Sequence, residues 1–458
     1  MWLLSKNEAK QLDLDAIASG IAELDLIQSA GVKSAVLISR LIPTDAKILV
    51  LCGPGHNGAD GVVAAAELSR WAFSVDVIEF KDLAGFLSSE KSYDVFVDAL
   101  FGIGLARHFD SLTVLAIAKL NSLSGIKIAL DTPSGLDVQT GNSWGAIFKA
   151  DHTLTIERPK PGFYLNLGPE HCGKIHLVRG VFDSHLVKRH AHSVFLLSRK
   201  LVKRWIPSRK ASDNKTRGGK TLILAGQPQM PGAALLASTA AARVGAGYVY
   251  VSEKEILRTR PEFLLWDQKD FSKFSSVLIG PGFGVNEKTA NIMQRLSETS
   301  LPVVADADAL SVLSQMSDFS IPENWILTPH AGELSRLIDL SAKEIESDRL
   351  QAVHLAQKKW GCIVVLKGFH TVVAAKNVSL IVPTGNAALG KAGSGDVLAG
   401  MIAGFLAQGL SSERSALLGC YVHGSMADHW LASGKDILSL QPSDLLEQLP
   451  TTLAKLRG

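Results

Sequence analysis

Short apolar runs alternate with helical stretches along most of this chain, and that alternation limits the folds it can adopt more than any other feature. Residues 46–53 (AKILVLCG) predict a buried strand ending in a glycine loop, and residues 61–72 (GVVAAAELSRWA) predict the helix after it. A second series begins with TLILAG at 221–226 and PGAALLASTAAARVGAG at 231–247. Repeated strand–loop–helix units predict parallel sheets covered by helices. We therefore expect an α/β fold in both halves.

The two series are expected to form separate domains. At 458 residues the chain exceeds the length at which a single hydrophobic core stops growing. Between the series, residues 184–220 are basic and only weakly periodic. The simplest interpretation of this stretch is a solvated linker with an edge element, and the alternative is a surface that attracts phosphate-bearing substrates. We place the boundary near residue 200, with domains at 1–200 and 201–458.

Composition narrows the partners and the compartment. The formal net charge is only +3, which argues against a whole-protein nucleic-acid or membrane-surface binder. No apolar run approaches the roughly 18–20 residues that cross a bilayer, and the start of the chain lacks the features of a signal peptide. The four cysteines are scattered, without the close pairs of a zinc site or a redox dithiol. We expect a cytoplasmic protein with small-molecule substrates and no nucleic-acid or membrane partner.

The loop after the first strand favours a phosphate-bearing ligand. Residues 53–61 (GPGHNGADG) are mostly small and precede a helix, so a ligand can approach the backbone and meet free N–H groups at the helix N-terminus. The loop is not the dinucleotide GxGxxG fingerprint, because Asn57 and Asp60 lie inside it. Glycine is also the default residue of tight turns, so the loop alone leaves a purely structural role open.

Two later strands end in aspartates. Asp98 opens the segment DALFGIG and Asp131 opens DTPSGLD, each where a parallel strand is expected to finish. Ligands of open α/β sheets bind outside the carboxyl ends of the strands. Either aspartate alone could merely cap a helix or a turn. Together with the first loop, the two aspartates are expected to converge on one crevice.

These segments resemble the NAD(P)H-hydrate epimerase family. GPGHNGADG, DALFGIGL, DTPSGLDVQTG and ADHTLTIERPKPGFYLNLGP occur in that family's order within residues 5–185. The resemblance implies a Rossmann-like three-layer domain that interconverts the R and S forms of hydrated NADH and NADPH. From its position at a strand end, we expect Asp131 to act as acid or base at the epimerised carbon. The resemblance also implies potassium ligands at Asn57, Asp98 and Ser134, whose oxygens suit a hard monovalent cation. Substrate contacts are implied at His56, Asn57, Gly58, Ala59, Asp60, Gly102, Ile103, Gly104, Leu105, Ala106, Arg107, His108 and Asp131.

Two positions depart from the family's pattern. His56 stands where the family usually has a second Asn, and its ring can still donate a hydrogen bond. Ala59 stands where a second Gly is usual, so a Cβ is added where the backbone is expected to approach the substrate. The expectation of epimerase activity therefore depends on where these two side chains lie.

A second glycine-rich segment marks the C-terminal half. Residues 386–400 (NAALGKAGSGDVLAG) lead into an alanine-rich helix whose first N–H groups could cradle a transferring phosphoryl group. Asp396, at the head of that helix, is placed to take a proton from an attacking hydroxyl. For a lone GxGD sequence, the alternative is an aspartate that interacts only with the helix dipole.

This half resembles the ribokinase-like superfamily, which implies a ribokinase-like α/β domain. Five further segments, in family order, narrow the resemblance to the ADP- or ATP-dependent NAD(P)H-hydrate dehydratase family: QMPGAA (229–234), GPGFG (280–284), DADAL (306–310), TPHAGE (328–333) and LKGFHT (366–371). The implied contacts with the hydrated nucleotide are Ala233, Gly284, His330, Ala331, Gly332, Glu333, Leu334, Ser335, Arg336 and Asp396. Those with ADP are Lys367, Gly368, Phe369, His370, Thr371, Asn386, Ala387, Ala388, Leu389, Gly390, Lys391, Ala392, Gly393, Ser394 and Gly395, with Ala392 standing where many members have glycine.

The implied chemistry uses phosphorylation to remove a hydroxyl group. Asp396 would activate the hydroxyl of the hydrated ring to attack the donor's terminal phosphate, and the ring nitrogen would then expel the phosphate ester. Lys367 and Lys391 offer cations to the phosphates. Magnesium is expected with the nucleotide, and Asp306 and Asp308, two apart on a predicted strand, could hold it or serve structurally. The fused layout resembles the bacterial arrangement, so we expect ADP as donor, giving AMP and phosphate.

The expected function is therefore repair of hydrated NADH and NADPH, by a homo-oligomer. One alternative is a small-alcohol kinase, such as a vitamin-precursor kinase, with an accessory nucleotide-binding module, but the N-terminal potassium motifs and TPHAGE argue against it. Another is a non-enzymatic nucleotide sensor, which would not need Asp396 as a base. His330, alone in a Thr-Pro-His turn, could be a capping or surface histidine, but among these motifs we expect it to contact substrate.

Overall fold

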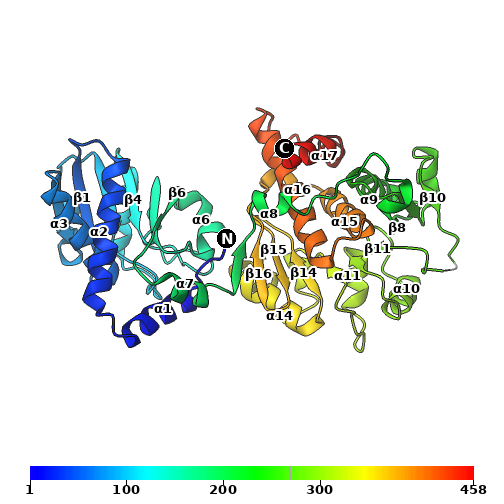
Figure 1. Cartoon of the computed structure of the whole chain (residues 1–458), viewed down its shortest axis with the longest axis horizontal. Coiled ribbons are helices and arrows are strands. Elements are labelled where there is room, and N and C mark those ends of the chain that lie inside the picture. The colour runs from blue at the N-terminus through cyan, green and yellow to red at the C-terminus, as the bar shows by residue number, and fades with distance from the viewer. Residues whose placement is uncertain (269) are drawn as a thin grey trace. The chain divides into compact units, whose positions relative to one another are not determined.

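The computed structural model describes residues 1–268 and 270–458, and the chain divides into two compact units, whose elements are labelled in Figure 1. The N-terminal unit spans Trp2–Val194, and the C-terminal unit spans Phe195–Gly458 together with Met1. Each unit is built on one sheet flanked by helices. The predicted α/β class is thus confirmed.

The N-terminal sheet has six parallel strands in the order β2-β1-β3-β4-β5-β6. The order reverses between β1 and β3, and the crevice outside the carboxyl ends at such a reversal is where α/β sheets bind ligands. The strands are β1 Lys47–Cys52, β2 Ser74–Glu79, β3 Val95–Ala99, β4 Ile126–Leu130, β5 His152–Ile156 and β6 Lys174–Val178. The α-helices are α1 Lys6–Ala18, α2 Glu23–Leu41, α3 His56–Arg70, α4 Leu83–Ser88, α5 Ser111–Ser122, α6 Gly168–His171 and α7 Ser184–His190.

Side chains of this sheet alternate between two hydrophobic cores. Ile48 and Val50 of β1 are buried with residues of α1, α2 and α3. Leu49 and Leu51 of the same strand are buried with residues of α4 and α5. Because successive strand residues point to opposite faces, helices must cover both faces of the sheet. This is the three-layer arrangement predicted for the N-terminal half.

The C-terminal sheet has ten strands in the order β10-β9-β8-β11-β12-β13-β14-β15-β16-β7. The pairs from β10 to β14 are parallel, but β14–β15 and β15–β16 are antiparallel, so the expectation of a parallel sheet is wrong at this end. Its strands are β7 Val194–Leu196, β8 Lys220–Leu224, β9 Tyr248–Val251, β10 Leu264–Leu265, β11 Ser276–Ile279, β12 Val303–Ala305, β13 Ile326–Leu327, β14 Ile363–Leu366, β15 Val372–Ala375 and β16 Val378–Ile381.

Two helices of the C-terminal unit, α9 and α15, pack side by side (Figure 1). Glycines of α15 allow the close approach, since a Cβ at Gly400 would lie 2.1 Å from the carbonyl oxygen of Ala237 in α9. The described helices include none that is both long and apolar enough to cross a membrane. The α-helices of this unit are α8 Arg199–Lys203, α9 Pro231–Val244, α10 Glu287–Ser297, α11 Asp308–Leu313, α12 Ala331–Leu334, α13 Ala342–Ser347, α14 Arg349–Trp360, α15 Ser394–Ala407, α16 Ser412–Ala432 and α17 Pro442–Arg457.

Two cationic side chains of the basic stretch form hydrogen bonds with the backbone at the C-terminal end of α17. Arg199 donates to the carbonyl oxygen of Lys455 at 2.6 Å, and Lys203 donates to that of Gly458 at 2.7 Å. These carbonyls lie at the C-terminal end of α17, where the helix leaves acceptors unpaired and carries partial negative charge. For these two residues the structural interpretation is favoured over attraction of substrate.

Replacing Gly400 by Ala should destabilise the C-terminal unit by about 1–3 kcal/mol, because the added methyl overpacks the α9–α15 contact. Differential scanning calorimetry of the full chain should show a lower melting temperature. Gly232→Ala is the matched control, because a Cβ at this position of α9 meets nothing within 4 Å. Equal melting temperatures for the two variants would contradict the packing account.

Candidate functional sites

A cavity of about 780 Å³ opens in the N-terminal unit at the carboxyl ends of β1, β3 and β4. Its walls come from α1 and α2 and from the loops that follow the strands. Most of the predicted substrate residues line it, namely His56, Asn57, Asp60, Gly102, Ile103, Gly104, Leu105, Ala106, Arg107 and Asp131.

Three predicted contacts do not line this cavity: Gly58, Ala59 and His108. Gly58 has a steric role, because a Cβ there would lie 1.9 Å from the carbonyl oxygen of Gly53. His108 stacks edge-on against Trp144, with ring centroids 5.4 Å apart. Ala59 does not line the cavity, so its methyl group, which the usual glycine lacks, does not reduce the volume of the cavity.

His56, the other departure, lies at the edge of the cleft. Its side chain is 72% exposed, and its Nε2 is 2.9 Å from a carboxylate oxygen of Glu23 in α2. The ring therefore links the strand-end loop to a helix of the cavity wall.

Of the three predicted potassium ligands, Asn57 lies in the first turn of α3, Asp98 at the end of β3 and Ser134 in the loop after β4. The Asp98 carboxylate is fully buried and accepts hydrogen bonds from the backbone N–H and the hydroxyl of Ser134, each at 2.7 Å. Burial raises the pKa of Asp98 to about 6, and the hydrogen bonds from Ser134 oppose the shift. Both polar atoms of the Asn57 side chain are buried without a hydrogen-bond partner among the described residues.

An unsatisfied buried amide costs free energy unless a ligand occupies it. The donor set of Asn57, Asp98 and Ser134 offers amide, carboxylate and hydroxyl oxygens, which fits a hard monovalent cation. Over residues 1–268 and 270–458, no group of three or more His, Cys, Asp or Glu side chains could hold a metal ion.

The floor of the cavity carries a buried ion pair. The Asp131 carboxylate lies 2.5 Å from the Lys160 ammonium, which also donates to the Thr155 hydroxyl at 2.7 Å. The backbone of Asp131 is left-handed, with φ of 56°, which strains a residue that is not glycine. Both side chains are nearly fully buried. A strained, buried and charge-paired aspartate in a cleft is typical of a reacting site.

Two further carboxyl groups share this cavity, and both have raised pKa values. Burial raises the pKa of Asp60 to about 8, and the charge of Asp131 adds to the effect. Burial and the same charge raise the pKa of Asp13 to about 6. Sequence reasoning assigned no role to Asp13 or Lys160, although Lys160 lies in the segment ERPKPG and Asp13 in the first helix.

The second candidate site lies at the head of α15. Asp396 stands in the first turn of that helix, after Gly393, whose left-handed φ of 91° forms the N-cap. Burial raises the pKa of Asp396 to about 6; the charge of Asp306 adds to this and that of Lys367 opposes it. A Cβ at Gly395 would lie 3.6 Å from the Lys367 ammonium, so the glycine loop runs directly past this lysine.

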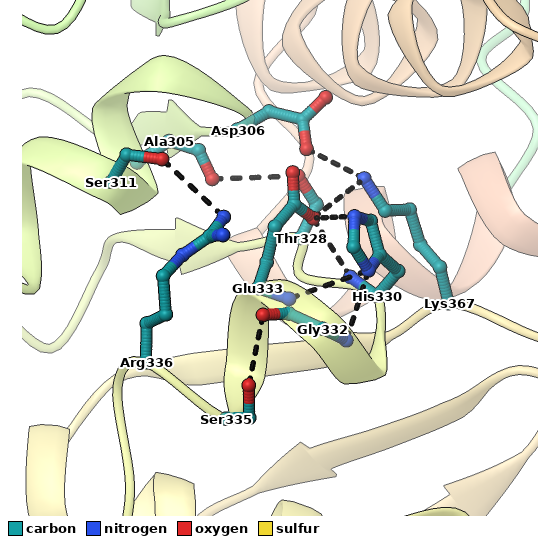
Figure 2. Close-up of polar contacts among 10 residues, drawn as sticks. All are labelled: Ala305, Asp306, Ser311, Thr328, His330, Gly332, Glu333, Ser335, Arg336 and Lys367. Carbon is teal, nitrogen blue, oxygen red and sulfur yellow. Dashed lines mark hydrogen bonds and ion pairs between the residues drawn. The ribbon is translucent and has the colours of Figure 1, made fainter. Parts of the chain in front are cut away.

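Lys367 is the centre of a charge network, drawn in Figure 2. Its ammonium is 2.8 Å from a carboxylate oxygen of Asp306 and 3.5 Å from one of Glu333. Burial lowers the pKa of Lys367, but these two carboxylates outweigh it and leave the pKa above its ordinary value. The lysine therefore stays cationic beside the glycine loop.

His330 caps α12 and is also accessible. Its Nδ1 accepts the backbone N–H groups of Gly332 and Glu333, and the Glu333 carboxylate accepts the His330 N–H, as Figure 2 shows. The capping interpretation of this histidine is thus confirmed. Its side chain is still 58% exposed, and its Nε2 lies 3.6 Å from a carboxylate oxygen of Glu333, so contact with the substrate stays a prediction.

The rest of the 331–336 segment divides between core and surface. Leu334 is fully buried, so its side chain contacts the core. Ser335 donates to the carbonyl oxygen of Gly332 at 2.9 Å, and Arg336 lies 3.4 Å from the hydroxyl of Ser311 (Figure 2). Ala331 is almost fully buried.

Asp306 and Asp308 do not share a strand, so that prediction is wrong. Strand β12 ends at Ala305, and Asp308 is the first residue of α11. Ala307, with a φ of 52°, turns the chain between them. Asp306 pairs with Lys367, whereas Asp308 accepts the backbone N–H of Gly284 at 2.8 Å. The two carboxylates therefore do not form a free pair for magnesium.

Gly284 and Ala233 lie beside one glycine-rich turn. Gly284 has a left-handed φ of 99°, and a Cβ there would lie 2.5 Å from the Asn286 amide. A Cβ at Gly282 would lie 3.3 Å from the Cβ of Ala233. Gly284 is buried and the turn is closely packed, so substrate contact at Gly284 and Ala233 stays a prediction.

The predicted nucleotide segments form two exposed loops. Phe369 is 48% exposed and stacks on His370, with ring centroids 4.2 Å apart. The Thr371 hydroxyl donates to the Gly368 carbonyl oxygen at 3.3 Å. In the second loop Lys391 donates to the carbonyl oxygen of Leu438. The remaining members are Ala387, Leu389, Gly390 and Ala392 at the surface or partly buried, and Ala388 and Ser394 in the interior.

These sites define an α/β protein with two reaction centres, a Rossmann-like cleft lined by acids and a ribokinase-like phosphoryl-transfer site. Family comparison is consistent with this class: the NAD(P)H-hydrate dehydratase model matches residues 221–451, and the YjeF-related protein N-terminus model matches residues 23–86 and 79–162. The chain belongs to the family of bifunctional NAD(P)H-hydrate repair enzymes.

Individual relatives support this assignment. The bifunctional NAD(P)H-hydrate repair enzyme Nnr of Coxiella burnetii is 32% identical, over 98% of each chain. The enzyme of the same name from Escherichia coli is 33% identical, over 89% of this chain and 85% of its own. A crystal structure of ADP/ATP-dependent NAD(P)H-hydrate dehydratase from Bacillus subtilis, co-crystallised with ATP and Mg²⁺, has a TM-score of 0.54 and 30% identity, covering 58% of this chain and all of its own.

The raised pKa of Asp60 predicts a pH-dependent stability effect. Between its unfolded pKa near 4 and its folded value of about 8, the folded state holds a proton that the unfolded state has lost, so this group destabilises the fold increasingly as pH rises. The melting temperature of Asp60→Asn should therefore exceed that of the parent by an amount that increases from pH 5 to pH 8. The exposed Asp45→Asn variant should show no such trend, and a difference for Asp60→Asn that stays constant with pH would contradict the account.

Proposed function

We propose that the chain repairs hydrated NADH and NADPH by epimerising the R and S hydrates in the N-terminal cleft and dehydrating the S form with ADP in the C-terminal site. The observation that carries this proposal is Asp396 at the head of α15, with Lys367 held cationic beside the glycine loop. That pair supplies a base and a phosphate-binding cation in a chain of the NAD(P)H-hydrate repair family. A small-alcohol kinase is not favoured.

In the N-terminal cleft, the carboxyl groups of Asp131 and Asp60 are the proposed base and acid. Asp131, beside the Lys160 ammonium, serves as the base that removes the proton of the carbinol hydroxyl on the hydrated ring. Asp60, whose pKa is about 8, is protonated at neutral pH and gives its proton to the ring nitrogen as the carbon–nitrogen bond breaks. The aldehyde so formed turns, and the nitrogen attacks its other face while both protons return. The configuration at that carbon is thereby inverted.

Potassium is the proposed ion of this cleft, held by Asn57, Asp98 and Ser134. Its support is the oxygen donor set and the buried, unpartnered Asn57 amide. When bound, the cation supplies positive charge next to the substrate's phosphates.

In the C-terminal site, Asp396 takes the proton of the ring hydroxyl, and the hydroxyl oxygen attacks the terminal phosphorus of ADP as the bond to AMP breaks. The lone pair of the ring nitrogen then expels the phosphate from carbon with the electrons of the carbon–oxygen bond. Loss of a proton from the neighbouring ring carbon restores the dihydronicotinamide. With a pKa of about 6, Asp396 is mostly ionised at neutral pH and ready to act as base.

The nucleotide is proposed to lie between the two exposed loops of this site. The stacked rings of Phe369 and His370 offer an aromatic surface to an adenine ring. Lys367 faces the phosphates together with the N–H groups at the head of α15. Magnesium bound with the nucleotide supplies charge neutralisation at the phosphates. Asp306 and Asp308 are already engaged by Lys367 and Gly284, so they would not form a free pair for this ion.

The compartment and the assembly are proposed from weaker observations. All four cysteines, Cys52, Cys172, Cys362 and Cys420, are buried free thiols, which fits the reducing cytoplasm. A homo-oligomer stays a prediction, which light scattering of the purified chain tests. ADP rather than ATP is likewise a prediction, and it is tested by supplying each nucleotide in turn.

The direct test mixes the purified chain with R- and S-hydrated NADH and either ADP or ATP, and follows the absorbance of regenerated NADH. We expect complete recovery with ADP. Absence of recovery with both donors would overturn the dehydratase proposal. Rapid recovery of the S half alone, with the R half following at its spontaneous rate, would overturn the epimerase proposal.

Asp396→Asn should abolish NADH recovery while binding ADP with nearly unchanged affinity, because the amide keeps the shape of the side chain but cannot accept the hydroxyl proton. Loss of a base is expected to lower kcat by about 100-fold or more. Isothermal titration calorimetry measures the ADP affinity in parallel. A variant with more than a tenth of the parental kcat would remove Asp396 from the role of base.

Lys160→Met should slow epimerisation and leave dehydration of the S hydrate unchanged, because it removes the buried cation beside Asp131 in the N-terminal cleft alone. The biphasic time course of NADH recovery separates the two rates. Lys10→Met is the matched control, since Lys10 lines the same cavity but has no ion pair in the described structure. An unchanged slow phase in Lys160→Met would contradict the assignment.

A further inference from the structure

Helix α16 contacts both ends of the glycine-rich segment that we propose to bind ADP. The segment, residues 384–396, is called the nucleotide loop below. At its start, the Thr384 hydroxyl donates to the carbonyl oxygen of Tyr421 at 3.0 Å. At its end, the Ser394 hydroxyl lies 3.1 Å from Nε2 of His423. Neither Tyr421 nor His423 belongs to any motif that the sequence singled out.

The strongest of these contacts comes from Asp428. One oxygen of its carboxylate accepts the backbone N–H of Gly385 at 3.0 Å, and the other accepts the side-chain amide of Asn386 at 3.1 Å. Hydrogen bonds to a charged acceptor are roughly twice as strong as neutral ones. Both oxygens of one carboxylate are thus used on two consecutive residues of the loop.

The Asn386 side chain is held through both its nitrogen and its oxygen. Its amide nitrogen donates one hydrogen bond to Asp428, and its oxygen accepts the backbone N–H of Ala388 at 3.1 Å. It therefore links the position of Asp428 to the turn Ala387–Leu389.

Two glycines allow α16 and the nucleotide loop to pack closely together. A Cβ at Gly424 in α16 would lie 2.4 Å from the backbone carbon of Thr384, so only glycine lets the helix and the loop approach this closely. Gly385 has a left-handed φ of 107°, which turns its N–H towards Asp428. The loop is therefore held by charge, by hydrogen bonds and by close backbone packing on one face of α16.

His423 holds the other end of the loop without adding charge. Its ring is almost fully buried. Burial lowers the pKa of His423 to about 4, so the ring is neutral at physiological pH. A neutral ring next to Ser394 orders the head of α15 without competing with Lys367 for the phosphates.

We infer that Asp428 is a positioning residue that holds the first part of the nucleotide loop in the form that receives the donor's phosphates. It acts through Gly385 and Asn386 and touches neither the substrate nor the donor. The inference rests on the proposed function, because it concerns the same nucleotide site. A preformed loop lowers the entropy cost of ordering it on binding, so the effect falls on nucleotide affinity rather than on the chemical step.

The test compares Asp428→Asn with the parent chain in ADP titration calorimetry and in steady-state NADH recovery. The variant keeps the size of the side chain, but its N–H₂ group replaces one carboxylate oxygen. It therefore faces the N–H of Gly385 or of the Asn386 amide, and one of the two hydrogen bonds is lost. We expect the KM and Kd for ADP to rise by about 10-fold or more, with kcat within about 3-fold of the parent. Glu413→Gln, at an exposed position of the same helix, is the matched control and should change neither constant.

A compensating double variant separates positioning from general damage. In Asn386→Asp/Asp428→Asn, the amide of residue 428 can accept from Gly385 and donate to the new carboxylate, and that carboxylate can still accept from Ala388. All three hydrogen bonds return with the net charge unchanged, so the Kd for ADP should return to within about 3-fold of the parent. Asn386→Asp alone sets two carboxylates together and should bind worst.

Distinct outcomes identify which claim fails. An unchanged Kd for ADP in Asp428→Asn, or a double variant that binds no better than Asp428→Asn, would overturn the positioning role alone. If the parent chain binds neither ADP nor ATP, the proposed function fails and the positioning role fails with it.

Discussion

A lysine lies among carboxylates in each of the two candidate sites, and the proposed chemistry of both sites depends on the charge of that lysine. Lys160 pairs with Asp131 in the N-terminal cleft, and Lys367 pairs with Asp306 and Glu333 in the C-terminal site. Removing one partner of a buried pair leaves an uncompensated charge, which costs about 3–5 kcal/mol. Asp60 and Asp396, for which the described residues include no ion-pair partner, have pKa values of about 8 and about 6. Neutral pH lies between these values, which fits the proposed roles of Asp60 as an acid and Asp396 as a base.

Sequence patterns predicted the features that recur along the chain, namely the strands, the helices and the polar loops between them. The strand–loop–helix rhythm predicted the sheets, and the aspartates at strand ends predicted where polar groups gather. The antiparallel pairing of β14, β15 and β16 was not predicted, because apolar strands look alike in either direction and a single left-handed residue, Lys376, turns the chain between β15 and β16. Asp306 and Asp308 were misplaced because β12 ends at Ala305 and the left-handed Ala307, two residues further on, turns the chain into α11.

Site residues that act through distant partners were missed. Asp428 is 42 residues from Asn386 in sequence, and Lys160 is 29 from Asp131, so neither pair leaves a periodic or local signal. Lys160 had one detectable sign, its place in ERPKPG within a segment that resembles the epimerase family. Asp428 lies in the last quarter of a long helix with no glycine loop near it in sequence. Only the folded contact shows that it holds the loop.

The central claim is that the C-terminal site phosphorylates a hydroxyl so that the hydroxyl can leave, which distinguishes it from a kinase that keeps the phosphate on its product. Phosphorus NMR of the complete reaction, combined with NADH absorbance, tests this most directly. The account predicts that NADH, AMP and inorganic phosphate accumulate in equal amounts from the hydrate and ADP. A stable phosphorylated hydrate that accumulates without NADH would contradict it.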